Sequence, residues 1–131
     1  MIGLDTNILV RYILQDDPLQ SPKSDAMIAS LSGEAEGWIA QATILELVWV
    51  LRSKKKLDRP GIATILDRLL QQNVIAIERG DVLRQALLLF RNGKADFADC
   101  LIAASARAAG CEVVLTFDRT AARDAGMQWA G

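Results

Sequence analysis

The chain contains no histidine among its 131 residues, and it contains only two cysteines, Cys100 and Cys111. Without histidine, neither a Ser-His-Asp or Cys-His arrangement nor an HExxH zinc helix can form. Two cysteines at this spacing indicate neither a disulfide framework nor a zinc site, and they fit a reducing compartment. Any chemistry must therefore depend on carboxylates, lysines, hydroxyls or a bound metal ion.

The chain also lacks a long apolar run and a strong net charge. No stretch approaches the roughly 20 apolar residues that a membrane span needs, and an acid at position 5 precedes any apolar segment of the signal-peptide kind. We therefore expect a cytoplasmic protein with no membrane segment. The net charge of −1 argues against a protein that coats nucleic acid through indiscriminate phosphate binding.

Strands and helices are expected to alternate along the chain. Short apolar segments predict strands at 2–5, 38–40, 74–77, 111–116 and 127–129. Apolar spacing and capping signals predict helices at 6–15, 18–31, 43–54, 60–72, 81–91, 96–109 and 119–125. Helix 43–54 is apolar nearly all round, so we expect it to be buried. The alternation predicts one α/β domain over residues 1–131, built around a mostly parallel sheet.

Four acids stand where such a fold places its ligand site. In open α/β sheets, ligands bind beyond the carboxyl ends of the strands. Asp5 ends the first predicted strand and Asp118 follows the fourth, while Glu46 and Asp99 lie in the first turns of two helices. All four side chains can converge on one edge of the sheet.

Each aspartate also has a purely structural interpretation. Asp5 and Asp118 can cap the helices that follow them, and Asp96 with Asp99 resembles a capping pair. Glu46 is harder to explain in this way, because the residues around it are apolar and an unpaired buried carboxylate is costly. Either Glu46 faces water from one edge of its helix, or a group inside the protein needs its charge. Clustered carboxylates take up protons or bind cations, and oxygen ligands without His or Cys suit Mg²⁺ or Mn²⁺.

Four longer segments carry a further signal: LDTNILVRYILQDDP, ATILELVWVL, ADFADCLIAASARAAG and VLTFDRTAAR. In this order and spacing they resemble the PIN domain family, and within it the VapC-type toxins of bacterial toxin–antitoxin pairs. The resemblance covers residues 2 to about 129 of the chain. It implies a three-layer α/β/α sandwich and an Mg²⁺- or Mn²⁺-dependent endoribonuclease, in which a metal-activated water hydrolyses an RNA phosphodiester bond.

The resemblance also assigns the site residues. The catalytic and metal-binding acids of the family fall on Asp5, Glu46, Asp99 and Asp118. Positions that support the site fall on Asn7, Asp96 and Thr116, and Asp96 stays open as an alternative ligand to Asp99. The resemblance further implies an RNA substrate, a cognate VapB-like antitoxin and a homodimer.

Basic and aromatic residues are candidates for binding RNA. Arg11 and Arg119 lie near proposed site acids and are candidates for phosphate contacts. The basic run RSKKKLDR, residues 52–59, can steer phosphates toward the acids, or it can be a solvated helix end. The three tryptophans, Trp38, Trp49 and Trp129, can stack on bases, although packing in a core or an interface is favoured.

Two other functions stay open. A haloacid-dehalogenase-like phosphatase also begins with a strand that ends in Asp, but its motif needs an acid where this chain has Asn7. A PIN-like module that binds RNA or protein without cutting would keep the same fold. The complete set of acids argues against such a module.

Overall fold

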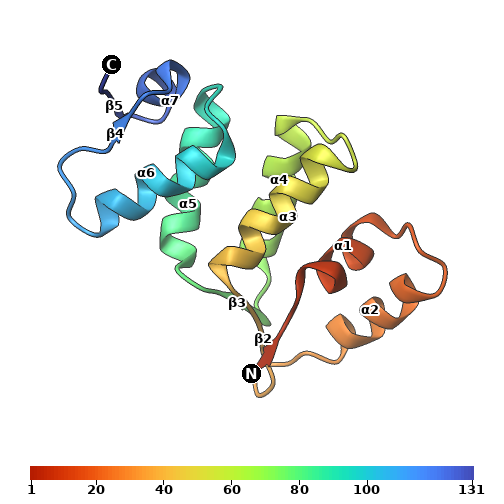
Figure 1. The fold of residues 1–131 in the computed structure, drawn as a ribbon. Helices are drawn as coiled ribbons and strands as arrows, with labels where there is room; N and C mark the ends of the chain where they lie inside the picture. Colours follow the sequence, from red (N-terminus) through yellow and green to blue (C-terminus); the bar gives the residue numbers. More distant parts are fainter. The chain divides into compact units, whose positions relative to one another are not determined.

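The computed structural model describes all residues, 1–131 (Figure 1). Every predicted strand and helix is present, and every strand pair is parallel. The elements are β1 (Ile2–Gly3), α1 (Thr6–Leu14), α2 (Gln20–Ala29), β2 (Gly37–Ile39), α3 (Gln41–Ser53), α4 (Arg59–Gln71), β3 (Ile75–Ile77), α5 (Gly80–Asn92), α6 (Phe97–Ala108), β4 (Leu115–Thr116), α7 (Arg119–Asp124) and β5 (Gln128–Trp129). The predicted α/β class with parallel strands is therefore confirmed. None of the helices combines the length and the apolar character needed to cross a membrane.

The chain divides into two compact parts, an N-terminal part, Met1–Glu78, and a C-terminal part, Arg79–Gly131. The prediction of one domain over residues 1–131 stays a prediction. In the N-terminal part, β1, β2 and β3 form a parallel sheet in that order. Helices α1 and α2 pack together, and α3 packs against α1 and α4 (Figure 1).

Helix α3 has one buried and one exposed side, so the prediction that this helix is buried is wrong for the exposed side. One side of the helix is buried, and it carries Ile44, Leu47, Val48 and Leu51. The side chains of Leu45 and Trp49 are 38% and 56% exposed, and Glu46 is exposed beside them. The physical reason is geometric: residues 45, 46 and 49 fall on the opposite side of a 3.6-residue helix from the buried set.

The start of α3 is capped by a residue distant in the sequence. Ala40 occupies the N-cap position and offers no side-chain acceptor. Instead, the carboxylate of Glu78 accepts a hydrogen bond of 2.9 Å from the Gln41 N–H, and the Glu78 N–H donates to the Ile39 carbonyl. Glu78 thereby joins the end of β3 to the first turn of the helix that carries Glu46.

The C-terminal part has its own core between α5 and α6. The rings of Phe90 and Phe97 meet edge to face, with centroids 5.5 Å apart and planes at 85°. The strand predicted at 111–116 is shorter than expected, because only Leu115 and Thr116 pair, opposite Gln128 and Trp129. Helix α7 packs on both strands of this two-stranded sheet and connects them.

Candidate active site

One residue, Thr6, makes hydrogen bonds to both Asp5 and Glu46. Asp5 is the N-cap of α1, and its carboxylate accepts a hydrogen bond of 2.8 Å from the Thr6 N–H. The Thr6 hydroxyl donates a hydrogen bond to Oε1 of Glu46. Because Thr6 is only 7% exposed, its position is set by packing. The capping interpretation of Asp5 is therefore confirmed, and the same turn also positions the second acid.

These acids line a pocket of about 540 Å³ in the N-terminal part. The pocket also receives basic and aromatic side chains, and its full lining is Asp5, Thr6, Asn7, Val10, Arg11, Glu46, Trp49, Val50, Lys54 and Lys55. The pocket therefore combines carboxylates that can bind a metal ion with basic side chains that can bind phosphate.

Two of the basic residues in the pocket, Arg11 and Lys55, form ion pairs with acidic side chains. Asp16 accepts from Lys55 at 2.7 Å and from Arg11 at 3.3 Å, and the hydrogen bond from Lys55 lowers the pKa of Asp16. Arg11 also donates to Gln20 at 2.8 Å and lies 3.9 Å from Asp17. Arg11 and Lys55 therefore stand at the pocket in defined positions, although part of their hydrogen-bonding capacity is already used.

In the C-terminal part, three acids act on one another. Asp99 is half-buried, and its pKa is raised first by this burial and then by the negative charges of Asp96 and Asp118. Asp96 is the N-cap residue of α6, but its side chain makes no capping hydrogen bond. The predicted capping pair of Asp96 and Asp99 is therefore absent, and the two carboxylates repel each other.

Asp118 is positioned by its own turn. Its carboxylate accepts a hydrogen bond of 2.9 Å from the Ala121 N–H and so caps α7, as the capping interpretation expects. The Asp118 N–H donates to the Thr116 hydroxyl at 3.0 Å. Next to it, the Arg119 guanidinium lies 3.7 Å from the ring centre of Trp129. Arg119 therefore stacks on an aromatic ring from β5.

The chemistry of these donors fits a hard divalent cation. All are carboxylate oxygens and the chain has no histidine, and burial together with the charges of Asp96 and Asp118 raises the pKa of Asp99. Neither part by itself gathers three or more acidic or thiol side chains into a group that could hold a metal ion. That Asp5, Glu46, Asp99 and Asp118 share one metal site stays a prediction.

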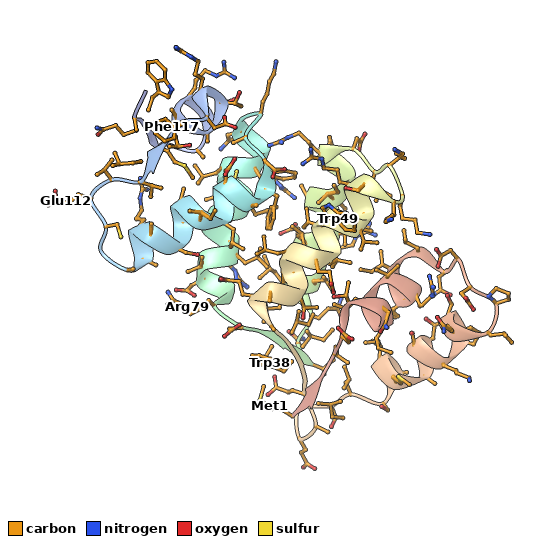
Figure 2. All side chains as sticks on the ribbon, in the orientation of Figure 1. Met1, Trp38, Trp49, Arg79, Glu112 and Phe117 are labelled. Atoms are coloured by element: carbon orange, nitrogen blue, oxygen red, sulfur yellow. The ribbon has the colours of Figure 1, made fainter.

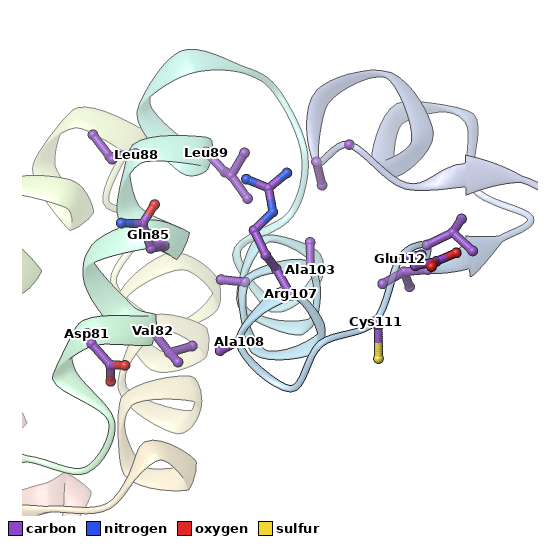
Figure 3. A pocket seen from close by; sticks show the side chains of 15 residues that line it. Asp81, Val82, Gln85, Leu88, Leu89, Ala103, Arg107, Ala108, Cys111 and Glu112 are labelled. Carbon is purple, nitrogen blue, oxygen red and sulfur yellow. The ribbon is translucent and has the colours of Figure 1, made fainter.

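A second pocket, of about 350 Å³, lies in the C-terminal part among α5, α6 and residues 111–114 (Figure 3). Its walls are mainly small and apolar, and its charged lining residues are Asp81, Arg107 and Glu112. None of the predicted site acids lines it. The candidate active site is therefore assigned to the predicted acids and not to this second pocket.

Two positioning residues were missed by the sequence analysis. Thr6 holds Asp5 and Glu46, and Glu78 caps the helix that carries Glu46. The sequence does contain a local signal for Thr6, because a hydroxyl residue directly after a strand-ending acid is expected in the first turn of a helix. Glu78 has no comparable local signal, because its partner lies 37 positions away.

The model of the PIN domain family matches residues 2–126, so this chain belongs to the PIN domain family. A curated relative, described as a VapC ribonuclease from Aquifex aeolicus (strain VF5), is 25% identical over 117 residues. The match covers 88% of this chain and 86% of the relative. The family resemblance noted in the sequence is therefore confirmed, and with it the α/β fold class of that family.

Proposed function

We propose that this protein is a VapC-type endoribonuclease, the toxin of a toxin–antitoxin pair, formed by one PIN domain and acting in the cytoplasm. The observation that carries the proposal is the pair of carboxylates, Asp5 and Glu46, which Thr6 holds at one pocket although they are distant in the sequence. Family membership and the relative described as a VapC ribonuclease support it.

Each site residue has a role in this proposal. Asp5, Glu46, Asp99 and Asp118 hold Mg²⁺ or Mn²⁺, with Asp96 as a supporting acid or an alternative ligand. Such a cation, when bound, polarises the scissile phosphate and lowers the pKa of the attacking water. Thr6 orients the Glu46 carboxylate by donating from its hydroxyl, and the Thr116 hydroxyl orients Asp118 by accepting from the Asp118 backbone N–H. Asn7 lines the same pocket and supports it.

The basic residues attract and orient the RNA backbone. Arg11, Lys54 and Lys55 line the pocket that contains Asp5 and Glu46, so they stand where a phosphate would approach these acids. Their positive charge, which Asp16 and Asp17 neutralise in part for Arg11 and Lys55, reduces the repulsion between the acids and a phosphodiester. Arg119 remains a second candidate for a phosphate contact, from its place over Trp129.

The test is a cleavage time course on structured RNAs with Mg²⁺, with Mn²⁺ and with EDTA. We expect discrete cuts that need the metal and fall at least about 100-fold in a Glu46→Gln variant, because an amide is a poor metal ligand. The matched control is Glu34→Gln, an exposed glutamate in the turn before β2, which keeps full activity.

Three results would contradict the proposal. Cutting that survives EDTA, or that is equal in Glu46→Gln, would mean a different mechanism or a contaminating nuclease. RNA binding without cutting under every metal condition would favour a non-cleaving PIN-like module.

For the partners, we propose a homodimer and a VapB-like antitoxin, and light scattering with and without the co-expressed antitoxin measures both.

A further inference from the structure

Trp49 is the most exposed of the three tryptophans. It stands on α3 (Figure 2), and the residue is 56% exposed. Trp129 is 42% exposed but lies beneath the Arg119 guanidinium, and Trp38 is partly buried within β2. An indole buries 150–250 Å² when it packs, so leaving one in water forgoes a large hydrophobic gain. Trp49 therefore presents an uncovered indole at the surface, where a ligand can contact it.

The surroundings of Trp49 suit a nucleic acid. Trp49 lines the same pocket as Asp5 and Glu46, and it follows Glu46 by three positions, so both side chains lie on neighbouring positions of one helix face. The ammonium of Lys54 lies 5.5 Å from the centre of the indole ring. Unpaired RNA offers both a π-face for the ring and phosphates for the lysines.

The positive charge beside Trp49 favours RNA over an apolar protein segment as the ligand. Lys54 lies over the indole and Lys55 lines the same pocket, and strongly hydrated ammonium groups are costly to cover with apolar side chains. A strand that carries one negative charge per nucleotide instead gains from them. The combination of an exposed aromatic ring and adjacent cations is the arrangement that binds single-stranded nucleic acid.

We propose that Trp49 is the stacking platform for one unpaired base of the RNA substrate, adjacent to the phosphodiester on which Asp5 and Glu46 act. This inference rests on the proposed ribonuclease function and adds a substrate requirement to it. A base must leave its pair to stack on the indole, so the cut falls in a single-stranded loop or bulge. The positive charge of Lys54 attracts both the π-face of the indole and the phosphate beside the stacked base.

The experiment uses the full-length protein and a labelled hairpin RNA with single abasic positions introduced one at a time across its loop. Binding is measured by anisotropy in EDTA, and KM and kcat are measured with Mg²⁺. We expect Trp49→Ala and Trp49→Leu to weaken binding and raise KM by about 5- to 150-fold, the range of one base–aromatic stack. Trp49→Phe, which keeps a π-face, should retain most of the affinity.

The decisive comparison is between the variant and the missing base. In wild-type protein, one abasic position should weaken binding by the same factor as Trp49→Ala, and it should cause no further loss in that variant, because both changes remove the same stack. The matched control is Leu45→Ala, an apolar residue on the same exposed side of α3, which should leave RNA affinity unchanged.

Failure of this inference and failure of the proposed function are distinguishable. Unchanged RNA affinity in Trp49→Ala, or fully additive losses from Trp49→Ala and every abasic position, would overturn the stacking role even if cleavage is present. Loss of antitoxin binding alone in both Trp49→Ala and Leu45→Ala would assign this face to a protein partner. Absence of cleavage would contradict the ribonuclease, while the anisotropy comparison would still decide the role of Trp49.

Discussion

The Thr6 hydroxyl donates a hydrogen bond to the Glu46 carboxylate across 40 positions of the sequence. Since the Thr6 N–H also holds the Asp5 carboxylate at 2.8 Å, one buried residue sets the positions of two acids. The carboxylate in the apolar segment ATILELVWVL carries no cost of burial, because Glu46 is exposed. Glu46 lies on the exposed side of α3, and its charge is oriented by a hydroxyl from the turn that follows β1.

Replacing Thr6 with valine should impair catalysis more than folding. Valine keeps the buried shape but donates no hydrogen bond, so the Glu46 carboxylate loses its orientation. We expect the free energy of unfolding to fall by about 1 kcal/mol and kcat to fall about 10- to 100-fold, in line with the loss of one charged hydrogen bond. Thermal melts and steady-state cleavage measure the two effects. Thr6→Ser is the control, and a serine variant as impaired as valine would contradict the role of the hydroxyl.

Removing the Glu78 carboxylate should loosen the start of α3. Glu78→Ala leaves the Gln41 N–H without its acceptor, which should cost about 0.5–2 kcal/mol, the range for loss of a helix cap. Glu78→Gln keeps an acceptor oxygen and should cost less. Urea unfolding of both variants measures the difference. Equal stability of Glu78→Ala and wild type would show that water replaces this cap fully.

Asp99 should make stability depend on pH in the direction opposite to most acids. Its folded pKa lies above the ordinary 3.8, because burial and the charges of Asp96 and Asp118 disfavour its ionised form. Its favourable contribution is therefore complete below pH 3.8 and is lost as pH rises through the folded pKa. At neutral pH and without metal, Asp99→Asn should unfold at the same temperature as wild type or slightly higher.

The gain should stay within about 1 kcal/mol, because Asp99 is only half-buried and solvent screens its neighbours. Thermal melts in EDTA at several pH values between acid and neutral measure it, with Glu112→Gln, an exposed glutamate, as the control. The same Asp99→Asn variant should lose cleavage. A clear loss of stability at neutral pH would mean that Asp99 makes a favourable contact that outweighs this repulsion.

Phe97 should be the most sensitive position near the C-terminal acids. It is 2% exposed, packs edge to face on Phe90 and stands between Asp96 and Asp99 at the start of α6. Phe97→Ala should lower the free energy of unfolding by about 3–5 kcal/mol through lost burial and a cavity. Phe97→Leu should cost less, since it keeps most of the volume. Denaturant melts test both, and a cost below about 1 kcal/mol for alanine would show that the core closes around the gap.

Local patterns were sufficient for the order and type of the elements. Period-2 and period-3.6 spacing, Asp caps and the turn residues depend on neighbours a few positions away, so they are legible in one sequence. The acids at strand ends and helix starts could be selected for the same reason, and Asp5 and Asp118 indeed cap the helices that follow them. The predicted strand at 111–116 was too long, because pairing with β5 reaches only Leu115 and Thr116.

The sequence by itself thus determined the α/β class, the PIN family pattern and the residue types available for chemistry, because these follow from short-range spacing and composition. The tertiary structure alone decided which side of α3 faces water, which hydroxyl holds Glu46 and which carboxylate caps the helix that carries it. Those contacts join residues 37 and 40 positions apart. Strand pairing and helix packing create them, and no local pattern records which distant side chains such packing will bring together.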